Sequence, residues 1–202
     1  MAFDITSRAP CAIIYQSELD YISRCILDSK HIETGGELFG FWTANGTPVV
    51  LLAIGPGPKA NHQTTFFSQD VEYLVTLGRA LIARFGLQHI GEWHSHHQLD
   101  LARPSAHDAW TMTSSIQNRH LGRFLMGLGN CDEKSSTFNA YEFVETFGTD
   151  FRQLPWDVKE GVSPFREGVE RDETISAMMY RPKTEAASHA VKTETIKEVE
   201  NV

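Results

Sequence analysis

Residues 91–108 of the chain read GEWHSHHQLDLARPSAHD, a stretch that runs from an expected strand into an expected helix. On a strand, residues two apart project to the same side, so His94 and His96 present two imidazoles to one point. At the start of the helix, Ser105 and Asp108 lie three apart on one face. Two imidazoles and one carboxylate, with a fourth position open to water, are typical ligands of catalytic zinc. The stretch therefore predicts a Zn2+ site formed by His94, His96 and Asp108.

Each half of this pattern also has a plainer interpretation. Ser105 and Asp108, which follow Pro104, can form a capping box in which both side chains bind backbone amides at the helix start. Taken alone, that interpretation is the more common one, and a lone His-x-His pair is weak evidence of a metal. The two patterns a dozen residues apart together favour the metal site. Five other histidines are expected at the surface or in loops: His62, His89, His97, His107 and His120.

A hydrolytic zinc site also needs a group that accepts and redelivers a proton. Zinc lowers the pKa of a coordinated water to about 7, and a carboxylate that does not bind the metal can take up the proton. Glu33 is our first choice, because it precedes a Gly-Gly pair and a strand that can run beside the histidine strand. Glu92 is the local competitor, either as the base or as a hydrogen-bonding support for the metal ligands.

Outward from this stretch, strand and helix signals are mixed along the chain. The Asn45-Gly46 pair predicts a hairpin turn between two of the strands. This order of elements predicts an α/β fold, a mixed β-sheet flanked by helices. The expected strands lie at 11–15, 33–42, 49–54, around 66–67, and at 87–96, 124–128 and 137–144; the expected helices lie at 17–30, 71–85 and from 105.

The clearest of these helices covers residues 71–85, where apolar residues repeat at helical spacing. Asp70 or Ser68 can cap its start, and Gly86 can end it. We expect one face of the helix to carry the apolar stripe Val71, Leu74, Val75, Leu81, Ile82 and Phe85.

The apolar density falls beyond about residue 150, where prolines recur and the last residues are mostly Lys, Glu, Thr and Ala. We therefore expect a single folded domain over residues 1–150. Residues 151–202 are expected to form a C-terminal extension that is flexible or docks on a partner. Its one apolar patch, Ile175 to Tyr180, could dock on the body of the domain or on that partner.

Charge and composition exclude several classes of protein. A net charge of -8 argues against nucleic-acid partners, because that binding draws its affinity from Lys and Arg on the phosphates. No segment has the roughly 18 to 20 consecutive apolar residues of a membrane span, and no export signal is visible, so we expect a cytoplasmic protein without membrane contact. Cys11, Cys25 and Cys131 are odd in number and far apart, which predicts reduced, buried and inert thiols.

Three motifs together resemble the JAMM metalloproteases of the MPN (JAB) superfamily, particularly its bacterial members. They are ETGGELFG at residues 33–40, GEWHSH at residues 91–96 and PSAHD at residues 104–108. GPGP at residues 55–58, followed by an Asp-capped helix, also resembles the bacterial branch. The resemblance covers roughly residues 10–145 and says little about the rest of the chain.

The resemblance implies that residues 1–150 form a metalloprotease domain of the MPN/JAMM fold, which is cytidine-deaminase-like. It implies zinc-dependent cleavage of a peptide or isopeptide bond after the C-terminal glycine of a ubiquitin-like modifier, in deconjugation or precursor processing, beside activating and conjugating enzymes. By position, His94, His96 and Asp108 would hold Zn2+, and Glu33 would be the general acid/base. Ser105 would stabilise the oxyanion, a role that a fixed hydroxyl donor suits.

Two departures from the family bear on the substrate. The family usually has proline after the second metal histidine, where this chain has His97, and eight residues rather than the typical seven separate His96 from Ser105. A longer loop can reshape the substrate groove, although packing fixes the strand end and the helix start. The alternatives are a peptidase acting on sulfur-carrier proteins or small conjugates, and an inactive MPN scaffold or binding module. All five family positions are filled, which favours an enzyme.

Overall fold

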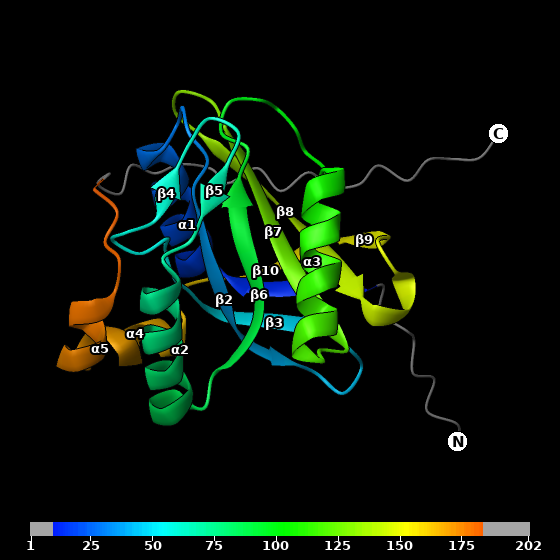
Figure 1. Cartoon of the computed structure of the whole chain (residues 1–202). Helices are drawn as coiled ribbons and strands as arrows, with labels where there is room; N and C mark the ends of the chain where they lie inside the picture. The colour runs from blue at the N-terminus through cyan, green and yellow to red at the C-terminus, as the bar shows by residue number, and fades with distance from the viewer. Residues whose placement is uncertain (1–9, 184–202) are drawn as a thin grey trace, which may run out of the picture.

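A mixed sheet of eight strands forms the centre of the molecule in the computed structural model, which describes residues 10–183 (Figure 1). The strand order is β10-β1-β3-β2-β6-β7-β8-β9, and β4 and β5 form a separate hairpin. The strands are β1 (Ala12–Tyr15), β2 (Gly35–Trp42), β3 (Pro48–Ala53), β4 (Asn61–His62), β5 (Phe67–Ser68), β6 (Gln88–Ser95), β7 (Arg123–Cys131), β8 (Ser136–Val144), β9 (Phe151–Leu154) and β10 (Trp156–Lys159). The helices are α1 (Gln16–Asp28), α2 (Val71–Phe85), α3 (Ala106–Arg119), the 3-10 turn η1 (Glu145–Phe147), α4 (Pro164–Arg171) and α5 (Glu173–Met178). The expected α/β class, with a mixed sheet flanked by helices, is confirmed.

The sheet curls until its two ends almost meet. The edge strands β9 and β10 are joined by Pro155 alone, although they stand at opposite ends of the strand order. The Ala12 amide donates to the Pro155 carbonyl at 2.9 Å. Across the seam, the Trp156 indole donates to the carbonyl of Phe138 on β8 at 2.9 Å, and the two rings stack. These contacts leave a nearly closed sheet.

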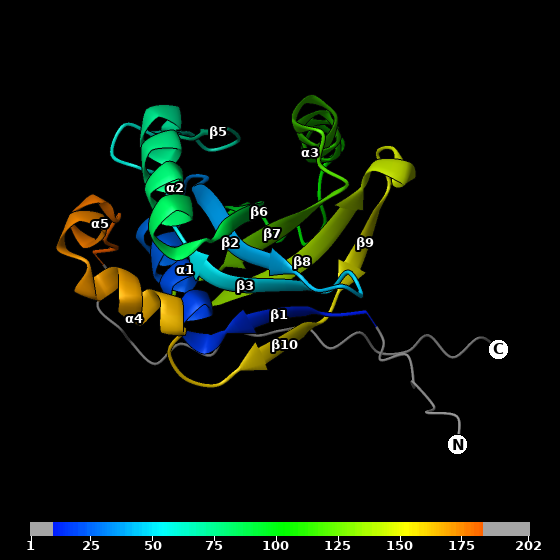
Figure 2. The same ribbon diagram turned by 90° about the horizontal axis from the view of Figure 1, so that it is seen from below.

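Helices cover both faces of the sheet. On the concave face, α1 packs into a core with buried residues of β2, β6, β7 and β8, Trp93 among them. On the other face, α2 and α3 lie over different strands (Figure 2). The α2 core includes Leu77 and Leu81 against Phe39, and α4 and α5 join it. The α3 core is separate and contains Met112, Ile116, Phe124 and Met126. The strands between these two cores, β2 and β6, carry the candidate site.

Local sequence signals placed most of these elements. Helix α2 spans the predicted residues, with the Asp70 carboxylate accepting the Tyr73 amide and Gly86 ending the helix at a φ of 67°. The Asn45-Gly46 turn joins antiparallel β2 and β3.

The apolar stripe predicted on α2 is only partly buried, which corrects the simple amphipathic interpretation. Of its six residues, Leu81 is fully buried, whereas Val71, Val75 and Ile82 are 68%, 44% and 52% exposed. Leu77, which was not assigned to the stripe, is buried with Leu81. The helix is therefore apolar on two adjacent faces, and one of them is open.

The predicted flexible extension is wrong for residues 151–183, because they complete the fold. β9 pairs with β8, and β10 pairs in parallel with β1. Arg166 of α4 donates to both carboxylate oxygens of Glu18 and to the Ala53 carbonyl, and its guanidinium lies over the Tyr21 ring. Glu18 is completely buried, so this pair fixes α4 to the body of the domain. The sequence boundary at residue 150 therefore falls inside the folded region.

The apolar patch Ile175 to Tyr180 docks on the body of the domain. Ile175 is buried in the α2 core. The Tyr21 hydroxyl donates to the Tyr180 carbonyl at 2.9 Å, and the Tyr180 amide donates to the Tyr73 hydroxyl at 3.0 Å. The part of the extension from residue 184 onward lies outside the described residues.

Two further expectations concern membranes and cysteines. Among residues 10–183, no helix combines the length and apolar character that crossing a membrane requires. All three cysteines are free thiols; Cys25 is buried as expected, whereas Cys11 and Cys131 are only half-buried.

Candidate metal centre

Strands β2 and β6 bring the glycine pair beside the histidine strand, as expected from the sequence. They pair antiparallel, with Gly35 opposite His94 and Gly36 opposite Trp93. A Cβ at position 35 would lie 2.5 Å from the Trp93 carbonyl oxygen, and one at position 36 would lie 1.9 Å from the Ile54 carbonyl oxygen. Both contacts are too short for any side chain, so the glycines allow the chain beyond Glu33 to approach the end of β6.

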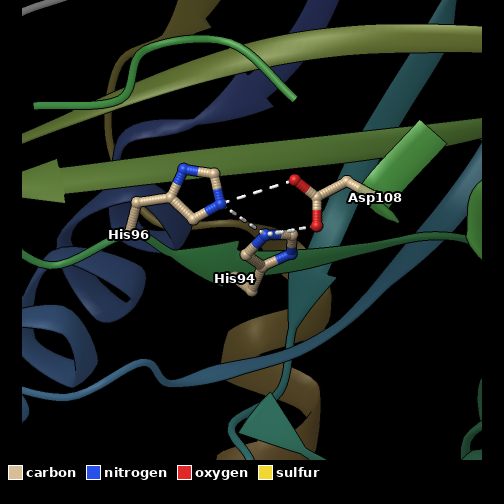
Figure 3. Close-up of side chains that lie close together, drawn as sticks. All are labelled: His94, His96 and Asp108. Atoms are coloured by element: carbon tan, nitrogen blue, oxygen red, sulfur yellow. Dashed lines mark hydrogen bonds and ion pairs between the residues drawn. The ribbon is translucent and has the colours of Figure 1, made fainter. Parts of the chain in front are cut away.

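His94, His96 and Asp108 converge, with both imidazoles turned toward the carboxylate (Figure 3). The two Nε2 atoms lie 3.2 Å apart. His94 Nε2 is 3.4 Å from Asp108 Oδ1, and His96 Nε2 is 3.5 Å from Asp108 Oδ2. The two ring nitrogens and the two carboxylate oxygens thus bring the three side chains together between the end of β6 and the start of α3, and we call this group the triangle.

Ser105 and Asp108 form the capping box, and the Asp108 carboxylate approaches the two imidazoles at the same time. The Ser105 hydroxyl accepts the Asp108 amide at 3.1 Å, and Asp108 Oδ2 accepts the Ser105 amide at 2.7 Å. The cap fixes the carboxylate at the first turn of α3, and this turn lies over the end of β6. The two interpretations of Ser105 and Asp108 therefore describe one arrangement.

The ring of His96 is oriented by a carbonyl that the sequence did not indicate. His96 Nδ1 donates to the Leu101 carbonyl at 3.1 Å, so in the neutral ring the lone pair is on Nε2 and faces the triangle, and only the protonated ring donates from Nε2 to Asp108. The Asn130 side-chain amide, on β7, donates to the same carbonyl at 3.1 Å. The loop after His96 thus supplies the orienting group, and no motif marks such a backbone contact.

Glu33 lies in the segment between α1 and β2, where the charges of the triangle act on it. Burial is the largest cause that raises the pKa of Glu33; the positive charges of His94 and His96 oppose it, and Asp108 adds to it. That these three side chains act on Glu33 is consistent with the proximity expected from the sequence. A carboxyl with a raised pKa exchanges protons more readily near neutral pH than an ordinary one.

The charges within the triangle are mutually stabilising. Burial would raise the pKa of Asp108, but hydrogen bonds from His94 and His96 outweigh it, and the pKa falls far below its usual range. Burial would lower the pKa of His96, but the hydrogen bonds to Asp108 and to the Leu101 carbonyl outweigh it, and the pKa rises. The carboxylate is therefore held ionised beside two imidazoles.

The chemistry and spacing of these donors fit a zinc ion. Tetrahedral ligands at about 2.0–2.1 Å from zinc lie about 3.3 Å from one another, close to the three observed separations. Two imidazole nitrogens and one carboxylate oxygen match a catalytic zinc site, and Glu33 adds a carboxylate outside the triangle.

The triangle lies in a groove between α2 and α3, which we call the α2–α3 groove. Its floor is β2 and β6, and Glu33 and Ser105 line it beside the triangle. Its α2 wall is largely apolar and is formed by Val71, Leu74, Val75, Gly78 and Ile82, together with the one charged residue Arg79. The hairpin of β4 and β5 borders the groove with Thr65, Phe66 and Phe67.

Glu92, the competing base, also lines this groove but stands opposite another acid. It pairs with Glu37 across β2 and β6, and Glu37 forms an ion pair with His89. A β-bulge at Ile90 shifts the facing of β6, so His89 lines the groove and Ile90 packs in the core. No local sequence pattern predicts this bulge.

The five histidines expected at the surface or in loops differ in their burial and in the elements that carry them. His107 and His120 are exposed, as expected. His97 lies in the loop after β6, as expected, although its side chain is only 5% exposed. The expectation is wrong for His89, which is half-buried in strand β6. His62 is half-buried on β4. Its ring, like that of His97, binds a backbone carbonyl.

Comparisons with known proteins support the fold alone. No protein-family model and no curated protein matches the chain. Among solved structures, it is similar to protein DSY2949 from Desulfitobacterium hafniense, with 15% identity and a TM-score of 0.56. The alignment covers 75% of this chain and 94% of that one.

Proposed function

We propose that the chain is a zinc-dependent peptidase or isopeptidase of the JAMM/MPN type. The observation that carries the proposal is the convergence of His94, His96 and Asp108 in a groove that Glu33 and Ser105 also line. These five residues come from three separate places in the sequence. They are the five positions on which the resemblance to the JAMM family rests.

His94, His96 and Asp108 would hold Zn2+, which lowers the pKa of a coordinated water and polarises the scissile carbonyl. Glu33 takes up the proton of the attacking water and delivers it to the leaving amine, a cycle that its raised pKa favours. Ser105 keeps its own hydroxyl hydrogen, which can rotate toward the groove and donate to the developing oxyanion.

The substrate proposed is an extended C-terminal segment of a ubiquitin-like protein, cleaved after its terminal glycine. The groove supports an extended segment, because it continues from the triangle along β6 and between the helices. Deconjugation and precursor processing both present such a segment. Activating and conjugating enzymes of the same pathway would be the accompanying proteins.

The test combines a metal assay with incubation of the protein and a candidate modifier fused at its C-terminal glycine. We expect one zinc per chain, activity that a chelator abolishes, and activity that returns with added zinc. The Glu33→Ala variant should keep its zinc and lose about 10²–10⁴-fold in kcat. The Glu92→Gln variant is the matched control and should retain turnover. If Glu33→Ala keeps full turnover and Glu92→Gln loses it, the base is Glu92; a protein that takes up no zinc is not this enzyme.

A further inference from the structure

The backbone of Glu33 is held by the small hairpin of β4 and β5. The Glu33 amide donates to the Gln63 carbonyl at 2.8 Å. His62 Nδ1 donates to the Glu33 carbonyl at 2.9 Å. Both backbone polar groups of Glu33 therefore end on adjacent residues of one hairpin, although Glu33 precedes that hairpin by a whole β2–β3 unit.

The hairpin itself is too short to be rigid alone. Its strands have two residues each, and an isolated two-stranded hairpin is marginally stable at best. It is closed by the Gln63 amide, which donates to the Phe66 carbonyl at 2.8 Å. Its position must come from contacts with the rest of the domain.

His97 supplies one such contact from the residue that follows His96. Its Nε2 donates to the carbonyl of Thr64, at the hairpin tip, at 2.8 Å. Its own carbonyl accepts the Cys131 amide at the end of β7, also at 2.8 Å. His97 has a φ of 39°, in the left-handed region that residues with a side chain rarely adopt. Proline could adopt neither this backbone conformation nor the hydrogen bond.

A second contact places the hairpin over the end of β6. The Phe67 ring lies against Gly35, where an added Cβ would be 2.5 Å from the ring. The His62 and Phe67 rings pack together at 5.3 Å between centroids. The residue after Glu33 is tied separately to β6, because the Ser95 amide donates to the Thr34 carbonyl at 2.8 Å.

We propose that the β4–β5 hairpin positions Glu33, with His62 and His97 as positioning residues. His62 fixes the Glu33 carbonyl, and His97 fastens the hairpin tip to the chain directly after His96. The hairpin thus sets the orientation of the Glu33 carboxylate relative to the imidazole pair. The hydrogen bond from the Ser95 amide to the Thr34 carbonyl is a second, direct connection to β6. This role rests on the proposed function only where it concerns turnover; the positioning itself is a property of the fold.

The first test is amide hydrogen exchange of Glu33, measured by NMR in the metal-free protein. The variants are His62→Leu and His97→Ala. The matched control is His31→Leu, which changes an exposed histidine in the turn just before Glu33. We expect protection of the Glu33 amide to fall by about tenfold or more in the two variants and to stay unchanged in the control. Unchanged protection in both variants overturns the proposal, whether or not the protein is a peptidase.

The second test is turnover of the modifier fusion. His62→Leu and His97→Ala should lower kcat by about 10–100-fold, with KM and zinc content unchanged. His62→Asn and His97→Asn retain an N–H donor, and asparagine tolerates a positive φ, so both should restore most of the rate. Added to Glu33→Ala, the His62→Leu change should cost nothing more.

The outcomes separate the two proposals. A parent protein without activity on the fusion counts against the proposed function, while the exchange measurement still decides the positioning role. An equal loss of kcat in the parent and the Glu33→Ala backgrounds overturns the view that His62 acts through Glu33. If neither His62→Asn nor His97→Asn restores the rate, the view that these histidines act through their hydrogen bonds is overturned.

Discussion

At the scale of the residue, Asp108 makes two sets of contacts that are separable by chemistry. Its Oδ2 atom accepts the Ser105 amide and so caps α3, and the same carboxylate faces His94 and His96. An amide side chain keeps an acceptor oxygen for the cap but lacks the charge that zinc prefers.

The Asp108→Asn variant should therefore lose zinc while keeping the helix cap, and Asp108→Ala should lose both. In metal-free protein at alkaline pH, loss of the cap in Asp108→Ala should lower the free energy of unfolding by about 0.5–2 kcal/mol. Asp108→Asn should stay close to the parent. Zinc content and urea denaturation measure the two effects. Full zinc occupancy in either variant would contradict the assignment of the ligand.

The Cys25 thiol gives a second prediction at this scale. Burial raises the pKa of Cys25 to about 12, so the thiol stays protonated at neutral pH, and only the thiolate reacts with alkylating reagents. Iodoacetamide should leave Cys25 unlabelled in the native protein and label it in urea, where its pKa returns to the ordinary value. Mass spectrometry of the peptides is the measurement, and rapid native labelling would show that α1 opens.

At the scale of the element, the bounds that the sequence predicts well are those set by local signals. Helix α2 begins after Asp70 and ends before Gly86, because a capping carboxylate and a left-handed glycine act within one turn. Strand β10 was missed, because its alternation of apolar and polar residues covers only four positions in a region of low apolar density, and its partner β1 lies far away in the sequence.

The candidate site shows the same division. Spacing alone predicted the triangle of His94, His96 and Asp108, since a strand and a capped helix start are local structures. The support from Leu101 and His97 depends on the path of a loop, which no local pattern determines. The one signal at position 97 was a histidine where the JAMM metalloproteases that the sequence resembles usually have proline.

The two apolar faces of α2 should respond differently to substitution. Leu81→Ala, in the core, should lower the free energy of unfolding by about 2–5 kcal/mol. Ile82→Ser, on the exposed face beside the groove, should change it by about 0.5 kcal/mol or less. Urea denaturation measures both. A large loss at Ile82 would mean that this face is covered in the folded protein.

At the scale of the whole molecule, the domain depends on residues 151–183. They contribute both edge strands of the sheet and the Arg166 partner of buried Glu18. A buried carboxylate without its partner is strongly destabilising.

A chain ending at residue 150 should therefore fail to fold, whereas a chain ending at Lys183 keeps every contact described here. The measurements are far-UV circular dichroism and thermal unfolding of the two purified chains. If the shorter chain unfolds cooperatively at the same temperature as the longer one, strands β9 and β10 are not required for folding and the prediction is wrong.

The parallel pair of β1 and β10 also sets the order of events during synthesis. β1 is translated before the other strands of the sheet, and its outer neighbour β10 is the last of the described strands to be translated, so β1 stays unpaired on one side until then. Contacts between distant segments form slowly, because a long loop must close before they stabilise anything. Nascent chains arrested before Trp156 should therefore stay sensitive to protease, and chains arrested well beyond the end of α5 should become resistant.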